Sequence, residues 1–423
     1  MASTVSSVSD VSSPTPTIHG GIPLREDDAP FYLIYRTGLG ATDGTSIYLA
    51  KLLGGAHRPF VHVMWDAVEG GMDSPGATVV TDDLAPWGFL PFRRPAHLAA
   101  GLCRHLGLRW WDGARLNRPR MQRAVGRLPM RPKAAWIVCM MESDAEKIIP
   151  LWEALGEPPF VLHVMDIFHD GVSEEATPRF VDLIRRASHV ICISEEIARE
   201  VRRVGARSVS LVLCASSFST ARRHPGFARP LRVVLSGALW NICYSRNAAV
   251  EHLAAAWPLI KARWSDAELH YTGSSGGDFP AVLRRDLRDH GLLGTEDYEQ
   301  LLNTCDLAYL PVSHPGNSFA RFSLPSRLAD YLACGLPILA ATEPGTAVHS
   351  FLQSLPDGCA TNVRCADEVV SAISGFVTSP ERWETASLAA AAFARENLAV
   401  DAVRSQVVGA LHQYCGAGAR VNS

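Results

Sequence analysis

At 423 residues the chain is too long for a single ordinary core, and a usual domain size of roughly 100 to 200 residues predicts two or three domains. Hydrophobic residues make up 47% of the chain and charged residues 20%, a balance that is typical of globular proteins and excludes a largely disordered chain. The formal net charge of −3 gives no reason to expect a nucleic acid as partner.

No run approaches the roughly 18 consecutive apolar residues of a membrane helix, and the Ser/Thr/Pro-rich start is neither apolar nor basic enough for a signal peptide. We therefore expect a cytoplasmic protein in which residues 1–28 form a disordered tail. The ten cysteines include no CxxC pair, and some, such as Cys139 and Cys192, lie inside apolar runs, which favours reduced core residues.

From residue 31 onward, short apolar runs alternate with longer amphipathic stretches, as in parallel sheets covered by helices. The first strand is predicted at 31–36, followed by the glycine-rich turn TGLGATDG. Ile47, Ala50 and Leu53 then recur at helical spacing before a stop at Gly54–Gly55. The near-continuous hydrophobicity of the later strands indicates burial on both faces. These strands are predicted at 60–65, 136–141, 160–165, 189–194 and 208–213.

The segment 214–230 breaks this rhythm with Ser, Arg, Gly and Pro, and the alternation restarts after it, which indicates a domain boundary. The second half predicts strands at 231–236, 267–272, 306–312 and 336–341. The Ala-rich end of the chain predicts two closing helices, at 381–398 and 399–414. The chain is therefore expected to be α/β, with two similar halves.

The segment SLPSRLADYLACGLPILAA, at 323–341, has the order loop, helix, turn and buried strand. Pro325 suits the first helical turn and Gly335 suits the C-terminal stop. A cation such as Arg327 in the first turn opposes the helix dipole by about 0.3 to 1 kcal/mol unless an anion also lies there. Helix N–H groups, Ser323, Ser326 and Arg327 could therefore converge on a phosphate, with Asp330 one turn deeper at ribose hydroxyls. The alternative is that Arg327 and Asp330 form a solvated pair on an exposed helix face.

The string PSRLADYLACGLPILA resembles the signature of the "group one" (family four) retaining glycosyltransferases, which have the GT-B fold. Their pattern has Lys where this chain has Arg327 and Glu where it has Asp330, so both charges are kept. Many members carry a second Glu seven or eight residues upstream of that acid, where this chain has Phe322 and Ser323.

Other segments of the second half continue the resemblance over roughly residues 231–355. LSGALWN, at 235–241, resembles the family's first glycine loop, where the backbone at Gly237 would approach the donor diphosphate. Arg246 is a candidate second cation, or else a surface residue. HYTGSSGG, with Thr272 and Gly273, resembles the segment that lies against the base.

The first half matches more loosely. The turn containing Gly40, Asp43 and Gly44 resembles the loop that faces the interdomain cleft. The family often ends the strand at 160–165 with an acid near the reacting sugar, which points to Asp166 and then His169. Asp166 could equally cap the following turn, and Ser194 is expected to be a helix N-cap.

The resemblance implies two Rossmann-like domains with a cleft between them and C-terminal helices that cross back to the first domain. We expect an acceptor domain over 29–225, a nucleotide-sugar donor domain over 226–395, and a final helix over 396–423 that packs on the first domain. Asp166, His169 and Arg327 are the expected catalytic residues.

The implied reaction moves a sugar, with retention, from a nucleotide-diphosphate sugar to a glycan or a polyprenyl-diphosphate-linked acceptor, in surface polysaccharide or glycolipid biosynthesis. Helix N–H groups and Arg327 would stabilise the leaving diphosphate. No DxD segment and no His/Cys cluster with metal-ligand spacing is present in the sequence, so neither a metal nor a cofactor is expected.

The segment 93–133 holds eleven Arg or Lys residues and one acid, Asp112. This composition fits an anionic partner, either the inner face of a membrane or a diphosphate-linked acceptor, and fits equally a solvated Arg-rich insertion. Two other functions stay open: a nucleotide-sugar epimerase of the same fold, and a non-catalytic GT-B-like assembly partner.

Overall fold

The computed structural model describes residues 31–36, 44–53, 60–64, 78–81, 133–168, 171–219, 230–237, 248–274, 279–312 and 318–415. The predicted tail at 1–28 lies outside these residues.

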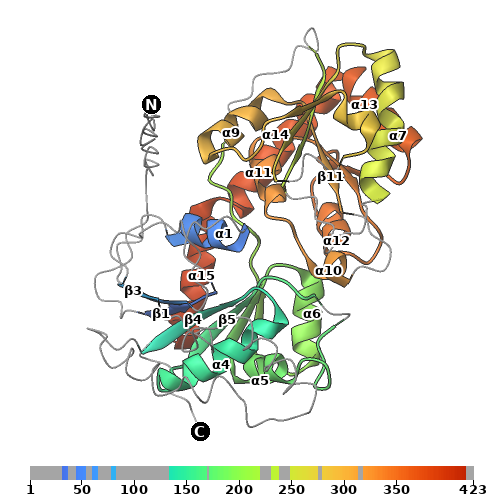
Figure 1. Ribbon diagram of the computed structural model, residues 1–423. Coiled ribbons are helices and arrows are strands. Elements are labelled where there is room, and N and C mark those ends of the chain that lie inside the picture. The colour runs from blue at the N-terminus through green and yellow to red at the C-terminus, as the bar shows by residue number, and fades with distance from the viewer. Residues whose placement is uncertain are drawn as a thin grey trace, which may run out of the picture.

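The described residues form two parallel sheets with helices around them (Figure 1). The elements of the first half are β1 (Phe31–Ile34), α1 (Gly44–Leu53), β2 (Phe60–Met64), β3 (Thr78–Thr81), β4 (Ala134–Cys139), η1 (Glu142–Asp144), α4 (Ala145–Ala154), β5 (Phe160–Val164), α5 (Pro178–Arg186), β6 (His189–Cys192), α6 (Glu195–Arg203) and β7 (Val209–Leu211). Those of the second half are β8 (Arg232–Ser236), α7 (Ala248–Arg263), β9 (Glu268–Thr272), α8 (Ala281–Arg284), β10 (Leu287–Asp289), α9 (Thr295–Thr304), β11 (Leu307–Pro311), α10 (Ser318–Phe322), α11 (Arg327–Ala333), β12 (Ile338–Ala341), α12 (Ala347–Gln353), β13 (Ala360–Asn362), α13 (Ala366–Val377), α14 (Pro380–Asn397) and α15 (Val400–Cys415).

The strand orders are β3-β2-β1-β4-β5-β6-β7 in the first sheet and β10-β9-β8-β11-β12-β13 in the second. Both orders reverse direction next to the first strand, at β1/β4 and at β8/β11, as in Rossmann-like sheets. In such sheets ligands bind beyond the carboxyl ends of the strands at the reversal point. The turns that follow β1 and β8 are therefore the places to look for a site.

All ten strands predicted from the apolar runs are present, within two residues at each end. The strands β3, β10 and β13 were not predicted from the sequence; all three are edge strands of three or four residues. Such short strands carry too few residues for an apolar pattern to stand out. The predicted boundary at 225/226 falls between β7 and β8, which belong to different sheets.

The two closing helices are confirmed, and the last one crosses back to the first domain. Figure 1 shows α14 among the helices of the second domain and α15 against the first sheet. The crossing is at Leu398 and Ala399, where the Leu398 carbonyl accepts a hydrogen bond from the Ser216 N–H at 2.8 Å. Ser216 lies in the earlier crossing segment, so both crossings of the chain meet at one point.

The helix α1 is confirmed, but the side chains that it buries are not those that marked it in the sequence. Tyr48, Leu49 and Leu52 are at most 2% exposed, whereas Ile47 is 43% exposed. Periodicity alone cannot distinguish the two faces of an apolar helix, because tertiary contacts decide which one faces the core.

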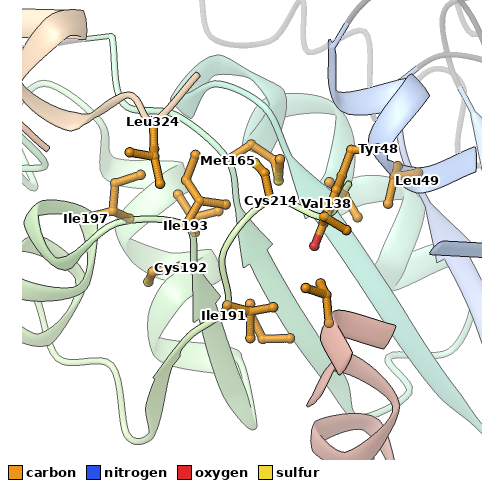
Figure 2. Close-up of a cluster of buried hydrophobic side chains, with 14 of the residues drawn as sticks. Tyr48, Leu49, Val138, Met165, Ile191, Cys192, Ile193, Ile197, Cys214 and Leu324 are labelled. Atoms are coloured by element: carbon orange, nitrogen blue, oxygen red, sulfur yellow. The ribbon is translucent and has the colours of Figure 1, made fainter. Parts of the chain in front are cut away.

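One apolar core joins the two domains. It includes Ile193 and Ile197 of the first domain and Leu324 of the second. Figure 2 shows Leu324 pointing toward Ile197 and Ile193, with Met165 close by. The Ser194 side chain accepts a hydrogen bond from the Ile197 N–H, which confirms its predicted N-cap role, and its hydroxyl donates to the Phe322 carbonyl at 2.8 Å. The domains are thus in direct apolar and polar contact.

The strand β5 crosses the middle of the first core, with all five of its residues buried. On one face Phe160 packs against Trp152 of α4. On the other face His163 stacks on Trp136 and meets Tyr48 of α1 edge-on. Burial lowers the pKa of His163 to about 3, so its imidazole is neutral at physiological pH.

The C-terminus of α11 ends as its sequence predicts. Gly335 has a φ of +64°, and its N–H donates to the Leu332 carbonyl at 2.9 Å. The Leu336 N–H donates to the Tyr331 carbonyl at 2.9 Å. These two bonds form a Schellman motif, which requires a left-handed residue at the glycine position. The motif fixes the direction in which the chain leaves α11 for β12.

Gly335→Ala is expected to destabilise the protein because a side chain in the left-handed region costs about 1–2 kcal/mol. This loss should lower the melting temperature in a thermal unfolding scan by a few degrees. The matched control is Gly409→Ala, in the exposed interior of α15 with nothing within 4 Å of an added Cβ, which should leave the melting temperature unchanged or raise it. Equal effects of the two substitutions would contradict this account of Gly335.

Candidate active site

The end of β8, at Ser236 and Gly237, is held in place by three tyrosines. The Ser236 N–H donates to the Tyr331 hydroxyl at 2.9 Å, and the Ser236 hydroxyl lies 2.7 Å from those of Tyr331 and Tyr298. The Tyr271 hydroxyl donates to the Gly237 carbonyl at 2.9 Å. The position of the backbone at the carboxyl end of β8 therefore depends on β9, α9 and α11.

Gly237 itself lies under the guanidinium of Arg327. Its φ is +89°, and a Cβ added there would collide with Nη1 of Arg327. Only glycine permits both this backbone conformation and the close approach of the guanidinium. The glycine loop and the signature helix, which are about ninety residues apart in sequence, thus form one site.

Arg327 is the first residue of α11, and its Nη1 donates to the Ser236 carbonyl at 2.6 Å. Its Nε is buried and has no hydrogen-bond partner. A buried donor without a partner is costly, and it is a natural place for an anionic ligand oxygen. The dipole of α11 favours an anion at the same end of the helix.

The end of β9 lies beside the same turn. The Gly237 N–H donates to the Thr272 carbonyl at 2.8 Å. The Thr272 hydroxyl and the Gly273 N–H both donate to the Gly291 carbonyl, at 2.8 Å and 2.9 Å. The structure therefore brings together Gly237, Thr272, Gly273 and Arg327, four of the predicted donor-site residues.

Asp330 is buried at the boundary between the domains. Its Oδ1 lies 3.2 Å from Nζ of Lys51 in α1 and accepts a hydrogen bond from the Ser216 hydroxyl at 2.6 Å. The alternative of a solvated Arg327–Asp330 pair is wrong, because Asp330 is only 6% exposed and its ion-pair partner is Lys51.

Asp166, at the end of β5, carries a perturbed carboxyl group. Burial raises its pKa to about 8, a hydrogen bond with Ser323 lowers it, and the charge of Glu142 raises it. Its Oδ1 is buried without a hydrogen-bond partner. The carboxyl is therefore mostly protonated at neutral pH and is bonded to a serine of the other domain.

Lys51, Asp166, Ser216, Ser323 and Asp330 thus form what we call the domain junction. Cys214 lies among them: burial and the charges of Asp166 and Asp330 raise the pKa of its thiol to about 12, while Lys51 lowers it. The carboxyl groups of Asp166 and Asp330 and the ammonium group of Lys51 therefore all lie close enough to the Cys214 thiol to change its pKa.

The phosphate site expected around α11 is assembled only in part. Ser323 is directed to Asp166, and Ser326 occupies the N-cap position of α11 without a side-chain cap hydrogen bond. Gly44 is the first residue of α1. Gly40, Asp43, His169, Arg246 and all of the segment 93–133 except Lys133 lie outside the described residues.

Several residues of this site carried no signal in the sequence. Lys51 looks like an ordinary lysine in the last turn of an amphipathic helix, and Ser216 lies in a stretch of polar residues. Tyr298 and Tyr271 look like core aromatics. Only the fold, which brings α1 and the crossing segment to α11, gives them a place in the site.

The described residues contain no group of three or more His, Cys, Asp or Glu side chains arranged to hold a metal ion. Within the same residues, no helix combines the length and the apolar character needed to cross a membrane.

No protein-family model matches the sequence, and no curated protein matches it. The structure matches that of Anabaena Alr3699/HepE in complex with UDP and glucose, with a TM-score of 0.59 and 14% identity over 91% of this chain and 100% of the other. It also matches sucrose-phosphate synthase from Thermosynechococcus elongatus, with a TM-score of 0.62 and 13% identity over 91% and 98%. The match to alpha,alpha-trehalose-phosphate synthase (UDP-forming) from Burkholderia xenovorans has a TM-score of 0.58 and 13% identity over 90% and 100%. The chain has the GT-B fold. Its two Rossmann-like sheets and the helix α15 that crosses back confirm the fold class expected from the sequence.

The raised pKa of Asp166 predicts a pH-dependent stability. The folded protein holds this proton up to about pH 8, whereas the ordinary pKa is 3.8, so the stabilisation is complete below pH 3.8 and is lost as the pH rises to about 8. Asp166→Asn mimics the protonated form. Its melting temperature relative to wild type is therefore expected to increase between pH 5 and pH 9 in thermal unfolding scans.

The control for this experiment is Asp266→Asn, at an exposed aspartate, which should shift the melting temperature equally at both pH values. A difference between Asp166→Asn and wild type that does not change with pH would contradict the raised pKa.

Proposed function

We propose that this chain is a glycosyltransferase that moves a sugar from a nucleotide-diphosphate sugar to an acceptor. One observation carries the proposal: the guanidinium of Arg327 lies over the Gly237 turn with its Nε buried and unpartnered. This turn is at the carboxyl end of β8, at the reversal point of a Rossmann-ordered sheet, where such folds bind nucleotides.

The arrangement suits the electrostatics of sugar transfer. As the bond to the sugar breaks, negative charge grows on the leaving diphosphate while the anomeric carbon becomes cationic. Arg327 would bind the diphosphate through donors that are already oriented by the Ser236 carbonyl. The planar guanidinium also allows two parallel hydrogen bonds, which the family's usual lysine cannot make.

The proposed donor is a UDP-sugar. The solved structure of Alr3699/HepE contains UDP and glucose, and the matching trehalose-phosphate synthase is UDP-forming. In this chain the base would lie against the end of β9, near Thr272 and Gly273, and the ribose near Asp330. Arg246 would supply a second cation to the diphosphate.

Asp166 is the proposed catalytic residue of the first domain, and His169, three residues later in the sequence, is the second candidate. A carboxyl group that is protonated at neutral pH is a hydrogen-bond donor and a poor nucleophile. Transfer with retention would therefore proceed by front-face attack assisted by the leaving phosphate, with Asp166 bonded to a hydroxyl of the sugar. We propose that this chemistry needs no metal and no cofactor.

The acceptor is proposed to be a glycan or a polyprenyl-diphosphate-linked sugar, bound by Gly40, Asp43 and Gly44, the last of which begins α1. The basic segment 93–133 would hold the enzyme at the inner face of an anionic membrane, in surface polysaccharide or glycolipid biosynthesis. Vesicles with and without anionic lipid would test this attachment, and equal binding to both would contradict it.

Donor binding is tested by thermal shift with UDP-, GDP-, dTDP- and ADP-sugars. Saturable stabilisation is expected with the UDP-sugar, because a ligand that binds only the folded state raises its stability. Arg327→Ala should abolish the shift. Arg284→Ala, at an exposed arginine of α8, is the matched control and should retain it. If no nucleotide sugar stabilises the wild type, the donor site is wrong and a non-catalytic role becomes the better interpretation.

Catalysis is tested by donor hydrolysis without acceptor. Asp166→Ala is expected to lower kcat by about 10²-fold or more and to leave the dissociation constant of UDP nearly unchanged, because Asp166 would act on the sugar and not on the nucleotide. Asp266→Ala is the control. Activity should persist in EDTA, and the freed sugar should keep its anomeric configuration by NMR. Conversion of the donor to an epimer would instead identify an epimerase.

A further inference from the structure

We infer that Lys51 of the first domain is a positioning residue of the donor site, which fixes Asp330 for contact with the ribose of the nucleotide. The inference rests on the proposed donor site in the second domain. According to this inference, ribose binding at the donor site also depends on α1, which belongs to the first domain.

The ammonium group of Lys51 lies between the Asp330 carboxylate and the ring of Phe218. Its Nζ lies 3.2 Å from Oδ1 of Asp330 and 5.2 Å from the ring centroid of Phe218. The side chains of Lys51 and Asp330 are only 17% and 9% exposed. An ion pair so shielded from water is screened little by salt, and neither charge can lose its partner cheaply.

The position of Lys51 is fixed in turn by the C-terminal helix. Arg404 of α15 donates from Nε to the Leu52 carbonyl at 2.6 Å and from Nη2 to the Lys51 carbonyl at 3.3 Å. These carbonyls belong to the last turn of α1, which has no intrahelical partners for them. Asp401 holds the same guanidinium at 2.6 Å. The helix α15 therefore fixes the backbone position from which the Lys51 side chain extends to Asp330.

The second group on Asp330 is fixed as well. Ser216 donates its hydroxyl to Oδ1 at 2.6 Å, and its own N–H is bonded to the Leu398 carbonyl. The Phe218 N–H donates to the same hydroxyl at 3.2 Å. Both donors on Asp330 thus come from segments that tie the two domains together.

This arrangement determines how the carboxylate faces the donor. Arg327 and Asp330 are three residues apart on α11 and share a face of the helix. A diphosphate held at Arg327 places its ribose next along that face. Lys51 and Ser216 both bind Oδ1, so the carboxylate cannot rotate without breaking two contacts. An aspartate, one methylene shorter than the family's glutamate, gains its fixed orientation from the other domain.

The test compares UDP with 2′,3′-dideoxy-UDP by isothermal titration calorimetry on the full chain. The wild type is expected to bind UDP about tenfold more tightly, because only UDP offers ribose hydroxyls to Asp330. Lys51→Met should lose most of this discrimination, Lys51→Arg should restore it, and Asp330→Asn should lose it. In the double variant Lys51→Met/Asp330→Asn, the loss of discrimination should be no larger than in Asp330→Asn alone, because both substitutions remove the same interaction.

Lys147→Met, at an exposed lysine of α4, is the matched control and should discriminate as the wild type does. Discrimination is a ratio of two affinities measured on the same protein, so a general loss of stability does not change it. Wild-type discrimination in Lys51→Met, with UDP binding abolished in Arg327→Ala, would overturn this inference and leave the proposed function standing. Equal binding of the two nucleotides by the wild type would also overturn it. If the wild type does not bind UDP, both this inference and the proposed donor site are wrong.

Discussion

The structure of the domain junction depends on the need to compensate buried charge. Asp330 lies in the interior between two domains, where an isolated carboxylate would be very costly. Lys51 and Ser216 provide that compensation from two other parts of the chain. Removing one partner of such a pair costs about 3–5 kcal/mol, since it leaves an uncompensated charge, so the pair also keeps α1, α11 and the crossing segment together.

The two crossings of the chain between its domains meet beside this junction. Ser216 lies on the outward crossing and Leu398 on the return, and a backbone hydrogen bond joins them. Arg404, just after the return, holds the end of α1. Domain orientation and the position of Lys51 are thus set by one set of contacts, which links the geometry of the proposed donor site to the packing of the C-terminal helix.

Asp166 illustrates a different response to burial. No cation is among the groups that set its pKa, so its proton is retained in place of an ion pair. Ser323, its partner, and Phe322 occupy the two positions at which many members of the resembled family carry a second glutamate. A second full acid there would place two carboxyl groups against each other at the junction, beside Glu142. The serine instead gives a neutral hydrogen-bonded pair with the protonated carboxyl group.

The sequence by itself determined ten of the strands, the α/β organisation in two halves, the two closing helices and the Gly335 stop, because these follow from local apolar patterns and glycine conformations. The return of the last helix to the first domain was expected from the family resemblance. It also indicated Arg327 as an unusual cation in a first helical turn. Only the tertiary structure decided which face of α1 is buried and that Lys51, not Arg327, pairs with Asp330. The physical reason is that burial and ion pairing depend on which distant segments of the chain come into contact. The residues next to a position in the sequence do not determine those contacts.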